Sequence, residues 1–130
     1  MKYLLLTITD DSAWSRMTGD EQERMSLPFR EYQQELRASG VLVGNYRPGP
    51  STEAKSVRAS SGKVEVLDGP AIPRTEQVTG VYVIEVPDLK TALTWAERNP
   101  AARFGTVEVR AAFSSGAEAK QYADSQHASG

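Results

Sequence analysis

Residues 2–8 place the strongest restriction on the fold, because this segment is apolar on both of its alternating sides. In an extended strand, successive side chains point to opposite sides. Tyr3 and Leu5 fall on one side, and Leu4, Leu6 and Ile8 fall on the other. Since neither side can be left in water, the segment is predicted to be a strand that is buried on both faces.

The next stretch has the period of a helix. Thr18 and Glu21 match a capping box, in which each side chain binds the backbone amide of the other residue. From there to Ser39, apolar residues recur at helical spacing: Met25, Phe29, Tyr32 and Leu36. Pro28 lacks an amide hydrogen, so we expect it to kink the helix or to restart it. Gly40 is expected to end the helix.

The rest of the chain is predicted to contain short strands and one more helix. Strands are expected at 41–43, 55–59, 63–67, 80–86 and 105–110, with a hairpin turn at Ser60-Ser61-Gly62. Asp88 is expected to cap a helix that stops at Asn99-Pro100. Segment 71–79 is polar and is expected to be irregular, whereas 114–130 has few apolar anchors and is expected to be a flexible C-terminal tail.

This order of elements indicates an α+β fold, a ferredoxin-like sandwich that spans residues 1–113. Such a fold has one sheet with its helices on one face, and the hairpin at 55–67 is a β-hairpin insertion in it. Two helices cover only one face of the sheet, so the other face of strand 2–8 needs a further cover. A second sheet, supplied by a symmetric homodimer, is the simplest cover.

Composition excludes several classes of function. The chain has no cysteine, and its single histidine, His127, lies within the last four residues, so thiolate sites and histidine-based triads or metal sites are not expected. The 15 basic and 17 acidic residues are interleaved, which argues against nucleic-acid binding. The N-terminal apolar run is interrupted at Thr7 and meets Asp10-Asp11, unlike a signal peptide or a membrane span. We therefore expect a cytoplasmic, metal-independent protein with no cofactor.

Several motifs that occur in this order resemble the YCII-related proteins, and more narrowly the subgroup named for its Asp-Gly-Pro-Phe motif. The motifs are GVLVG at 40–44, DGP at 68–70, EQ at 76–77, GVYVIEVPDL at 80–89, ALTWA at 92–96 and VEVR at 107–110. The resemblance implies a dimeric α/β barrel, in which two ferredoxin-like sheets face each other around a ligand-sized cavity. It implies no firm activity. Some members of the subgroup are encoded near, or fused to, alternative sigma factors.

The chain departs from this family at two points. Other branches of the superfamily are enzymes that use a His-Asp pair, which cannot be carried over because no histidine precedes position 127. The subgroup usually continues its motif with Phe-Ala-Glu-Thr-Lys, whereas residues 71–75 read Ala-Ile-Pro-Arg-Thr. If this loop lines the pocket, the ligand or the reaction differs from that of the subgroup. Arg74 is then expected to contact an anion; the alternative is a lone surface arginine.

The last strand carries candidate catalytic residues. Thr106, Glu108 and Arg110 point to one side, and Val107 and Val109 point to the other. If the valines pack under the helices, the polar side chains face the dimer cavity. There, Glu108 can act as a base, and Arg110 can hold a carboxylate or an enolate oxygen. The alternative is a structural ion pair between them.

Four further residues are candidates for the same site. Tyr82 can present its hydroxyl to a ligand, although a tyrosine in a strand more often serves packing. Asp68 can act as a general acid or base, although turn chemistry alone accounts for Asp-Gly-Pro. Tyr46 and Arg47 lie near the end of a predicted strand and are expected to line the rim of the pocket.

These side chains predict a cofactor-independent enzyme of the lyase, isomerase or cyclase type. Its substrate is expected to be a small carbonyl-containing or aromatic metabolite, because the available groups are carboxylates, tyrosines and arginines. Two alternatives stay open. One is a non-catalytic small-molecule-binding protein, and the other is a regulatory module associated with a transcription (sigma) factor.

Overall fold

The structure, a computed structural model, describes residues 1–128. The elements in chain order are β1 (Lys2–Asp10), η1 (Trp14–Arg16), α1 (Gly19–Ala38), β2 (Leu42–Tyr46), η2 (Ser51–Glu53), β3 (Lys55–Ser60), β4 (Lys63–Asp68), β5 (Glu76–Glu85), α2 (Leu89–Arg98), η3 (Pro100–Arg103), β6 (Thr106–Ala112) and α3 (Gly116–Ala128). The elements named η are short 3-10 helices.

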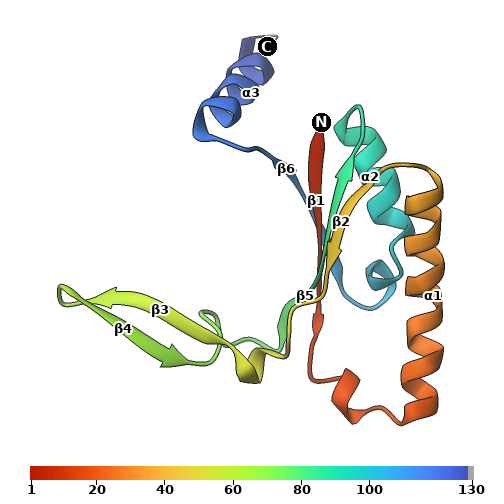
Figure 1. Cartoon of the computed structure of the whole chain (residues 1–130), viewed down its shortest axis with the longest axis vertical. Coiled ribbons are helices and arrows are strands. Elements are labelled where there is room, and N and C mark those ends of the chain that lie inside the picture. The colour runs from red at the N-terminus through yellow and green to blue at the C-terminus, as the bar shows by residue number, and fades with distance from the viewer. Residues whose placement is uncertain (129–130) are drawn as a thin grey trace.

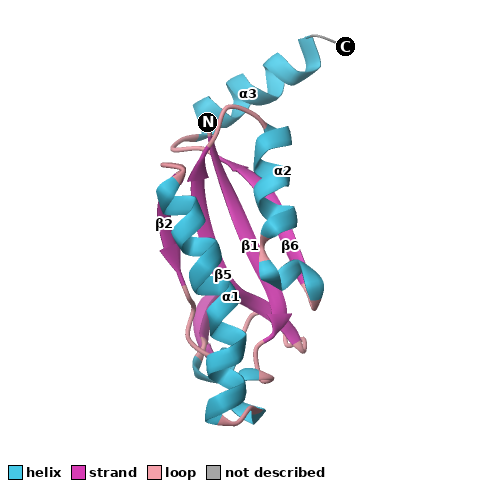
Figure 2. Ribbon diagram, turned by 90° about the vertical axis from the view of Figure 1, so that its right-hand side faces the viewer, coloured by secondary structure: helices cyan, strands magenta, loops and turns pink. Residues whose placement is uncertain are grey.

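Four strands form one antiparallel sheet in the order β2-β5-β1-β6. Helices α1 and α2 both lie on one face of this sheet (Figures 1 and 2). This is the predicted α+β, ferredoxin-like arrangement. Strands β3 and β4 form a separate two-stranded hairpin between β2 and β5, as the sequence also predicts.

The hydrophobic core fills the space between the sheet and the two helices. Its buried members are Tyr3, Leu5, Tyr32, Leu36, Tyr82, Ile84, Val86, Ala92, Trp95 and Ala96. The Tyr32 hydroxyl donates a hydrogen bond of 2.7 Å to the Trp95 carbonyl, which satisfies a polar atom in an apolar layer. The core therefore joins β1 and β5 to both helices.

Helix α1 begins with the predicted capping box. The Glu21 amide donates to the Thr18 hydroxyl at 3.2 Å, and the Thr18 amide donates to the Glu21 carboxylate at 3.1 Å. Gly40, with φ of 71°, follows its C-terminus, where an L side chain would be strained. Of the two outcomes expected for Pro28, the restart is wrong, because α1 runs through this residue as a single helix of 20 residues. The kink stays a prediction.

Two segments contain more regular structure than the sequence predicts. β5 begins at Glu76, inside the segment expected to be irregular, because its polar residues pair with the end of β1 through the backbone. Residues 116–128 form α3, where a tail without regular structure was expected. The centroids of the Phe113 and Tyr122 rings lie 5.1 Å apart, so the middle of α3 contacts the residue that follows β6. The flexibility of this tail stays a prediction. No helix within residues 1–128 is both long and apolar enough to cross a bilayer.

The face of the sheet opposite α1 and α2 is here called the open face. The register places Leu4 beside Val83 and Leu6 beside Val81, and these side chains are half-buried. Figure 1 shows the hairpin and α3 projecting on this side from opposite ends of the sheet, with a bay between them. The open face is thus apolar along β1 and β5, and in the described part of the chain no helix covers it.

Candidate functional site

The residues that the sequence nominates for the site lie in four parts of the structure. Thr106, Glu108, Arg110 and Tyr46 are on the open face, Arg74 is on the loop before β5, Arg47 and Tyr82 are on the helix side, and Asp68 ends the hairpin. The three proposed catalytic residues, Glu108, Asp68 and Tyr82, are therefore not brought together within one chain.

The polar row on β6 faces the open side, as predicted. Val107 and Val109 pack against the core, which turns Thr106, Glu108 and Arg110 to the other side. The Arg110 Nε donates a hydrogen bond of 2.9 Å to a Glu108 carboxylate oxygen. With exposed side-chain fractions of 68% for Arg110 and 42% for Glu108, water screens this ion pair in the single chain.

Asp68 and Tyr46 line neither of the two cavities described below. The Asp68 carboxylate accepts a hydrogen bond of 2.5 Å from Lys55 Nζ and its side chain is 90% exposed, so it acts as a cross-strand ion pair of the hairpin. Tyr46 pairs with Val81 and is 69% exposed, with its ring over Gly44. Neither contacts Glu108 or Tyr82 in the described residues.

A cavity of about 350 Å³ lies where β1 and β6 meet the loop before β5, and it is here called the sheet-end hollow. It is lined by Ile8, Arg74, Thr75, Glu76 and Thr106. Two predicted ligand-binding residues, Arg74 and Thr106, therefore meet in one cavity. Glu76 is a member that the sequence analysis missed, because it lies in the segment expected to be irregular.

The backbone of the loop at the sheet-end hollow is held in place. The Gln77 side-chain amide donates to the carbonyls of Ile72 and Arg74, at 2.8 and 2.9 Å. The Arg74 amide also donates to the Ile72 carbonyl at 2.9 Å. Across residues 1–128, no carboxylate lies within ion-pair distance of the Arg74 guanidinium. This loop thus presents an unpaired cation from a fixed turn.

The chemistry of the sheet-end hollow suits a small anion. A guanidinium can bind a carboxylate through two parallel hydrogen bonds. The hydroxyls of Thr75 and Thr106 can donate to a carbonyl oxygen, and Glu76 can accept from a hydroxyl or amine of the same ligand. Ile8 supplies an apolar wall.

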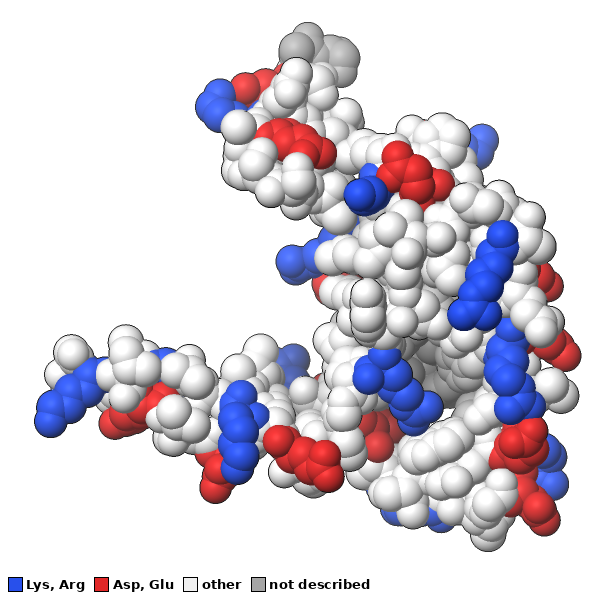
Figure 3. Space-filling model, in the orientation of Figure 1, with Lys and Arg blue, Asp and Glu red and all other residues white. Residues whose placement is uncertain are grey.

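A second hollow lies between the sheet and α1, and Figure 3 shows it with basic side chains at its rim. On this side of the sheet four residues interact with one another, and they are here called the helix-side group: Trp14, Gln33, Arg47 and Tyr82. The Arg47 guanidinium lies 4.7 Å from the centre of the Trp14 ring. Burial raises the pKa of the Tyr82 hydroxyl, whereas a hydrogen bond with Gln33 and the charge of Arg47 act in the opposite direction. The structure thus brings two further predicted residues, Arg47 and Tyr82, near each other.

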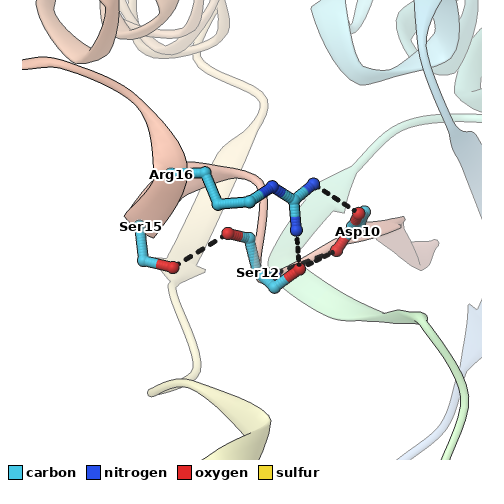
Figure 4. A network of polar contacts seen from close by, with 4 residues as sticks. All are labelled: Asp10, Ser12, Ser15 and Arg16. Atoms are coloured by element: carbon cyan, nitrogen blue, oxygen red, sulfur yellow. Dashed lines mark hydrogen bonds and ion pairs between the residues drawn. The ribbon is translucent and has the colours of Figure 1, made fainter.

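A polar network holds η1, and with it Trp14, at the end of β1 (Figure 4). The Asp10 carboxylate accepts from the Ser12 hydroxyl at 2.6 Å and from Arg16 at 3.1 Å. Ser15 donates to the Ser12 carbonyl at 2.8 Å. The hydrogen bonds from Ser12 and Arg16 hold the pKa of Asp10 below its usual value. The turn is therefore fixed independently of any ligand.

A cluster of threonine hydroxyls lies on the helix side of the sheet, near the end of β1. Thr79 Oγ1 lies 2.8 Å from Thr9 Oγ1 and 3.1 Å from Thr7 Oγ1. A Cβ on Gly80 would lie 2.7 Å from Thr7 Oγ1, so only glycine leaves room for this cluster. The sequence analysis missed these residues, although threonines alternating with apolar residues on β1 were a usable signal. No comparable signal marks Gln33.

A larger cavity, of about 520 Å³, lies between α1 and the α2–η3 segment. Its lining carries three glutamates and two arginines, so carboxylates outnumber the cations. Arg98 forms an ion pair with Glu35, and its guanidinium lies 4.3 Å from the centre of the Trp95 ring. The sheet-end hollow, where one glutamate faces an arginine and two threonines, is therefore the better candidate for an anionic ligand.

The sequence is similar to known proteins along most of its length. The pattern of the YCII-related domain matches residues 1–114, which run from β1 to just past β6. A protein of Rhizobium meliloti (strain 1021), whose name says only that it is uncharacterised, is 33% identical over 114 residues. That alignment covers 85% of this chain and 90% of the relative.

Proposed function

The chain belongs to the YCII-related domain family, and from this premise we propose that it binds a small carbonyl-containing anion in the sheet-end hollow and acts as a homodimer. The observation that carries the proposal is Arg74, an arginine without an ion-pair partner among residues 1–128 that lines this hollow with Thr106. The volume, about 350 Å³, lies in the usual range for small-molecule sites.

The homodimer follows from the open face. Its half-buried leucines and valines leave apolar area in water that a second sheet can remove, as in other face-to-face sheet packings. In such a pair, the row Thr106, Glu108 and Arg110 lies between the two sheets and extends from the sheet-end hollow along β6. Arg110 then adds a second cation for the ligand. Glu108 becomes a base candidate only once the pairing removes it from water.

Native mass spectrometry of protein purified gently from a producing host tests the binding proposal. We expect a discrete small-molecule mass on the wild type that Arg74→Ala loses. Arg24→Ala is the matched control, because Arg24 is an exposed arginine of α1. Retention of the ligand in Arg74→Ala and its loss in Arg24→Ala would contradict the assignment of the hollow.

A second candidate function is turnover at the helix-side group, and the specific observation is that the Arg47 cation acts on the buried Tyr82 hydroxyl. Arg47 can hold an anionic group of the substrate, while the Tyr82 hydroxyl donates to a carbonyl oxygen on which negative charge develops. This arrangement fits a cofactor-independent isomerase, lyase or cyclase. The ligand identified by mass spectrometry is then the compound to supply as substrate in an assay of conversion.

The Tyr82→Phe variant separates turnover from binding. If Tyr82 is a catalytic residue, Tyr82→Phe keeps the bound ligand but loses conversion, and Arg47→Ala, rather than Arg74→Ala, loses the ligand itself. If the protein only binds, neither the wild type nor Tyr82→Phe converts the ligand. A regulatory module of a sigma factor would instead carry no discrete ligand and would bind that factor.

A further inference from the structure

The β3–β4 hairpin carries an apolar surface that the rest of residues 1–128 leaves exposed. The register places Val57 opposite Val66 and Ala59 opposite Val64, on one side of the ribbon, here called the valine face. The exposed fractions of Val57, Val66 and Val64 are 64%, 68% and 74%. A ribbon of two strands is only marginally stable in water, and contiguous apolar patches mark interaction sites.

The other side of the ribbon is polar toward the tip and carries Leu67, opposite Ser56, at the base. Arg58 lies opposite Glu65 on this side, and both are exposed. The hairpin is therefore amphipathic, with one side suited to water and one side suited to a partner, although it has no core of its own.

The hairpin, here also called the arm, closes in a tight turn and is held by hydrogen bonds at its base. Ser61 and Gly62 have φ values of 51° and 78°, as a two-residue hairpin turn requires. At its base, the Gly69 amide donates to the Ala54 carbonyl at 2.7 Å, and the Ser51 amide donates to the Asp11 carboxylate at 2.7 Å. The valines are thus presented by a fixed element.

The arm extends on the open-face side of the sheet. Figure 1 shows it leaving one end of the sheet and pointing away from α1 and α2, and Figure 3 shows the bay that it bounds together with α3. A partner that covers the open face would therefore lie in reach of the arm.

We propose that the hairpin is a clasp whose valine face packs on a second copy of this chain, while the sheet of that copy occupies the bay. This inference rests on the homodimer proposed above and adds an interface element to it. The arm alone is smaller than the roughly 800 Å² per partner that a stable interface buries. Its partner must therefore cover the open face as well.

Charge favours a second copy as that partner. Glu108 and Arg110, of opposite charge, are neighbours on the open face. In a two-fold pair, residue i contacts j and j contacts i, so each of these charges can meet its counter-ion in the other copy. The net charge of −2, spread over interleaved acids and bases, creates little repulsion between copies.

Sedimentation equilibrium of the full chain tests the clasp with Val57→Thr/Val66→Thr. Threonine keeps the shape and β-propensity of valine, and these positions are exposed in the single chain, so the fold should survive. We expect the dimer dissociation constant to rise at least about tenfold, because each copy loses apolar contacts. The matched control, Arg58→Thr/Glu65→Thr, alters the polar side of the same strands and should leave the constant within about threefold.

The outcomes separate the clasp from the homodimer. An unchanged dissociation constant in Val57→Thr/Val66→Thr, with a dimeric wild type, overturns the clasp and leaves the homodimer standing. A wild type that is monomeric at all concentrations overturns both. Leu6→Thr on the open face should weaken any sheet-to-sheet pair, whether or not the arm takes part.

The absence of native cysteine permits a second readout. An environment-sensitive dye on Val64→Cys should shift its emission to the blue as the protein concentration rises through the dissociation constant. The same dye on Glu65→Cys, on the polar side of the ribbon, should not shift. Equal spectra at both positions would overturn the clasp.

Discussion

The two faces of the four-stranded sheet are built from alternating residues of the same strands but differ in what covers them. On the helix side, Leu5 and Ile84 are 0% exposed. On the open side, their neighbours Leu4 and Val83 are only half-buried, although they are equally apolar. The two faces are similar in composition along β1 and β5, but only one of them is covered by helices. The folding of one chain therefore buries the apolar side chains on only one side of these strands.

The helix-side face becomes polar where β1 ends, because Thr7 and Thr9 there replace the apolar residues of the core. The open face carries polar side chains at both ends, with Thr106 at the first end and Arg110 at the other. The sheet-end hollow lies at the first end, where both faces are polar, so we expect ligand chemistry there.

Truncating one leucine on each side should give the largest contrast. Leu36 is 0% exposed in the core, so Leu36→Ala should lower the free energy of unfolding by about 2–5 kcal/mol. Leu6→Ala should lower it by less than about 1 kcal/mol at concentrations where the chain is single, since Leu6 is already half in water. Urea unfolding followed by circular dichroism measures both. Equal losses at low concentration would mean that the open face is covered within one chain.

Adding a methyl group at the threonine cluster should have the next largest effect. The Cβ of Gly80→Ala would lie 2.7 Å from Thr7 Oγ1, so we expect a loss of about 1–3 kcal/mol in the free energy of unfolding. Gly19→Ala is the control, because its Cβ meets nothing within 4 Å. Thr7→Ala combined with Gly80→Ala should recover part of the loss. A neutral Gly80→Ala would show that this part of the helix-side face is loosely packed.

Alkaline pH should affect the helix side through its tyrosines. Burial raises the pKa of Tyr3, Tyr32 and Tyr82 above that of an exposed tyrosine. The folded chain then keeps protons that the unfolded chain releases from about pH 10, so this stabilisation is complete below that pH and is lost as the pH rises through the folded pKa values. Tyr82→Phe should flatten the decline in stability between about pH 9 and 11. An unchanged slope would contradict burial of the hydroxyl.

The sequence predicted the architecture because the architecture depends on local patterns. The alternation in residues 2–8, the capping box at Thr18 and the turn at Ser61-Gly62 each act through neighbouring residues, and each is confirmed. The start of β5 and helix α3 were missed because neither has a strong apolar pattern; the first is set by backbone pairing with β1.

The candidate site was less predictable, because cavities form between segments that are distant in sequence. The same-side row of Thr106, Glu108 and Arg110 followed from strand alternation and is confirmed as a row. That Arg74 would meet Thr106 depends on the return of the chain through the hairpin, which spacing does not reveal. Asp68 was predicted to lie at the site because of its Asp-Gly-Pro motif, but its position at the end of the hairpin exposes it to solvent.

The Glu108–Arg110 ion pair should give the smallest effect, but it tests most directly whether a second copy covers the open face. In the single chain both side chains are well exposed, so a double-mutant cycle with Glu108→Gln and Arg110→Gln should give a coupling energy of about 0.2–1 kcal/mol. If a second copy covers the open face, water no longer screens the pair, and the coupling in dimer stability should exceed that value. The cycle is therefore measured by urea unfolding below and above the dimer dissociation constant. A coupling that is the same at both concentrations would mean that the open face stays in water.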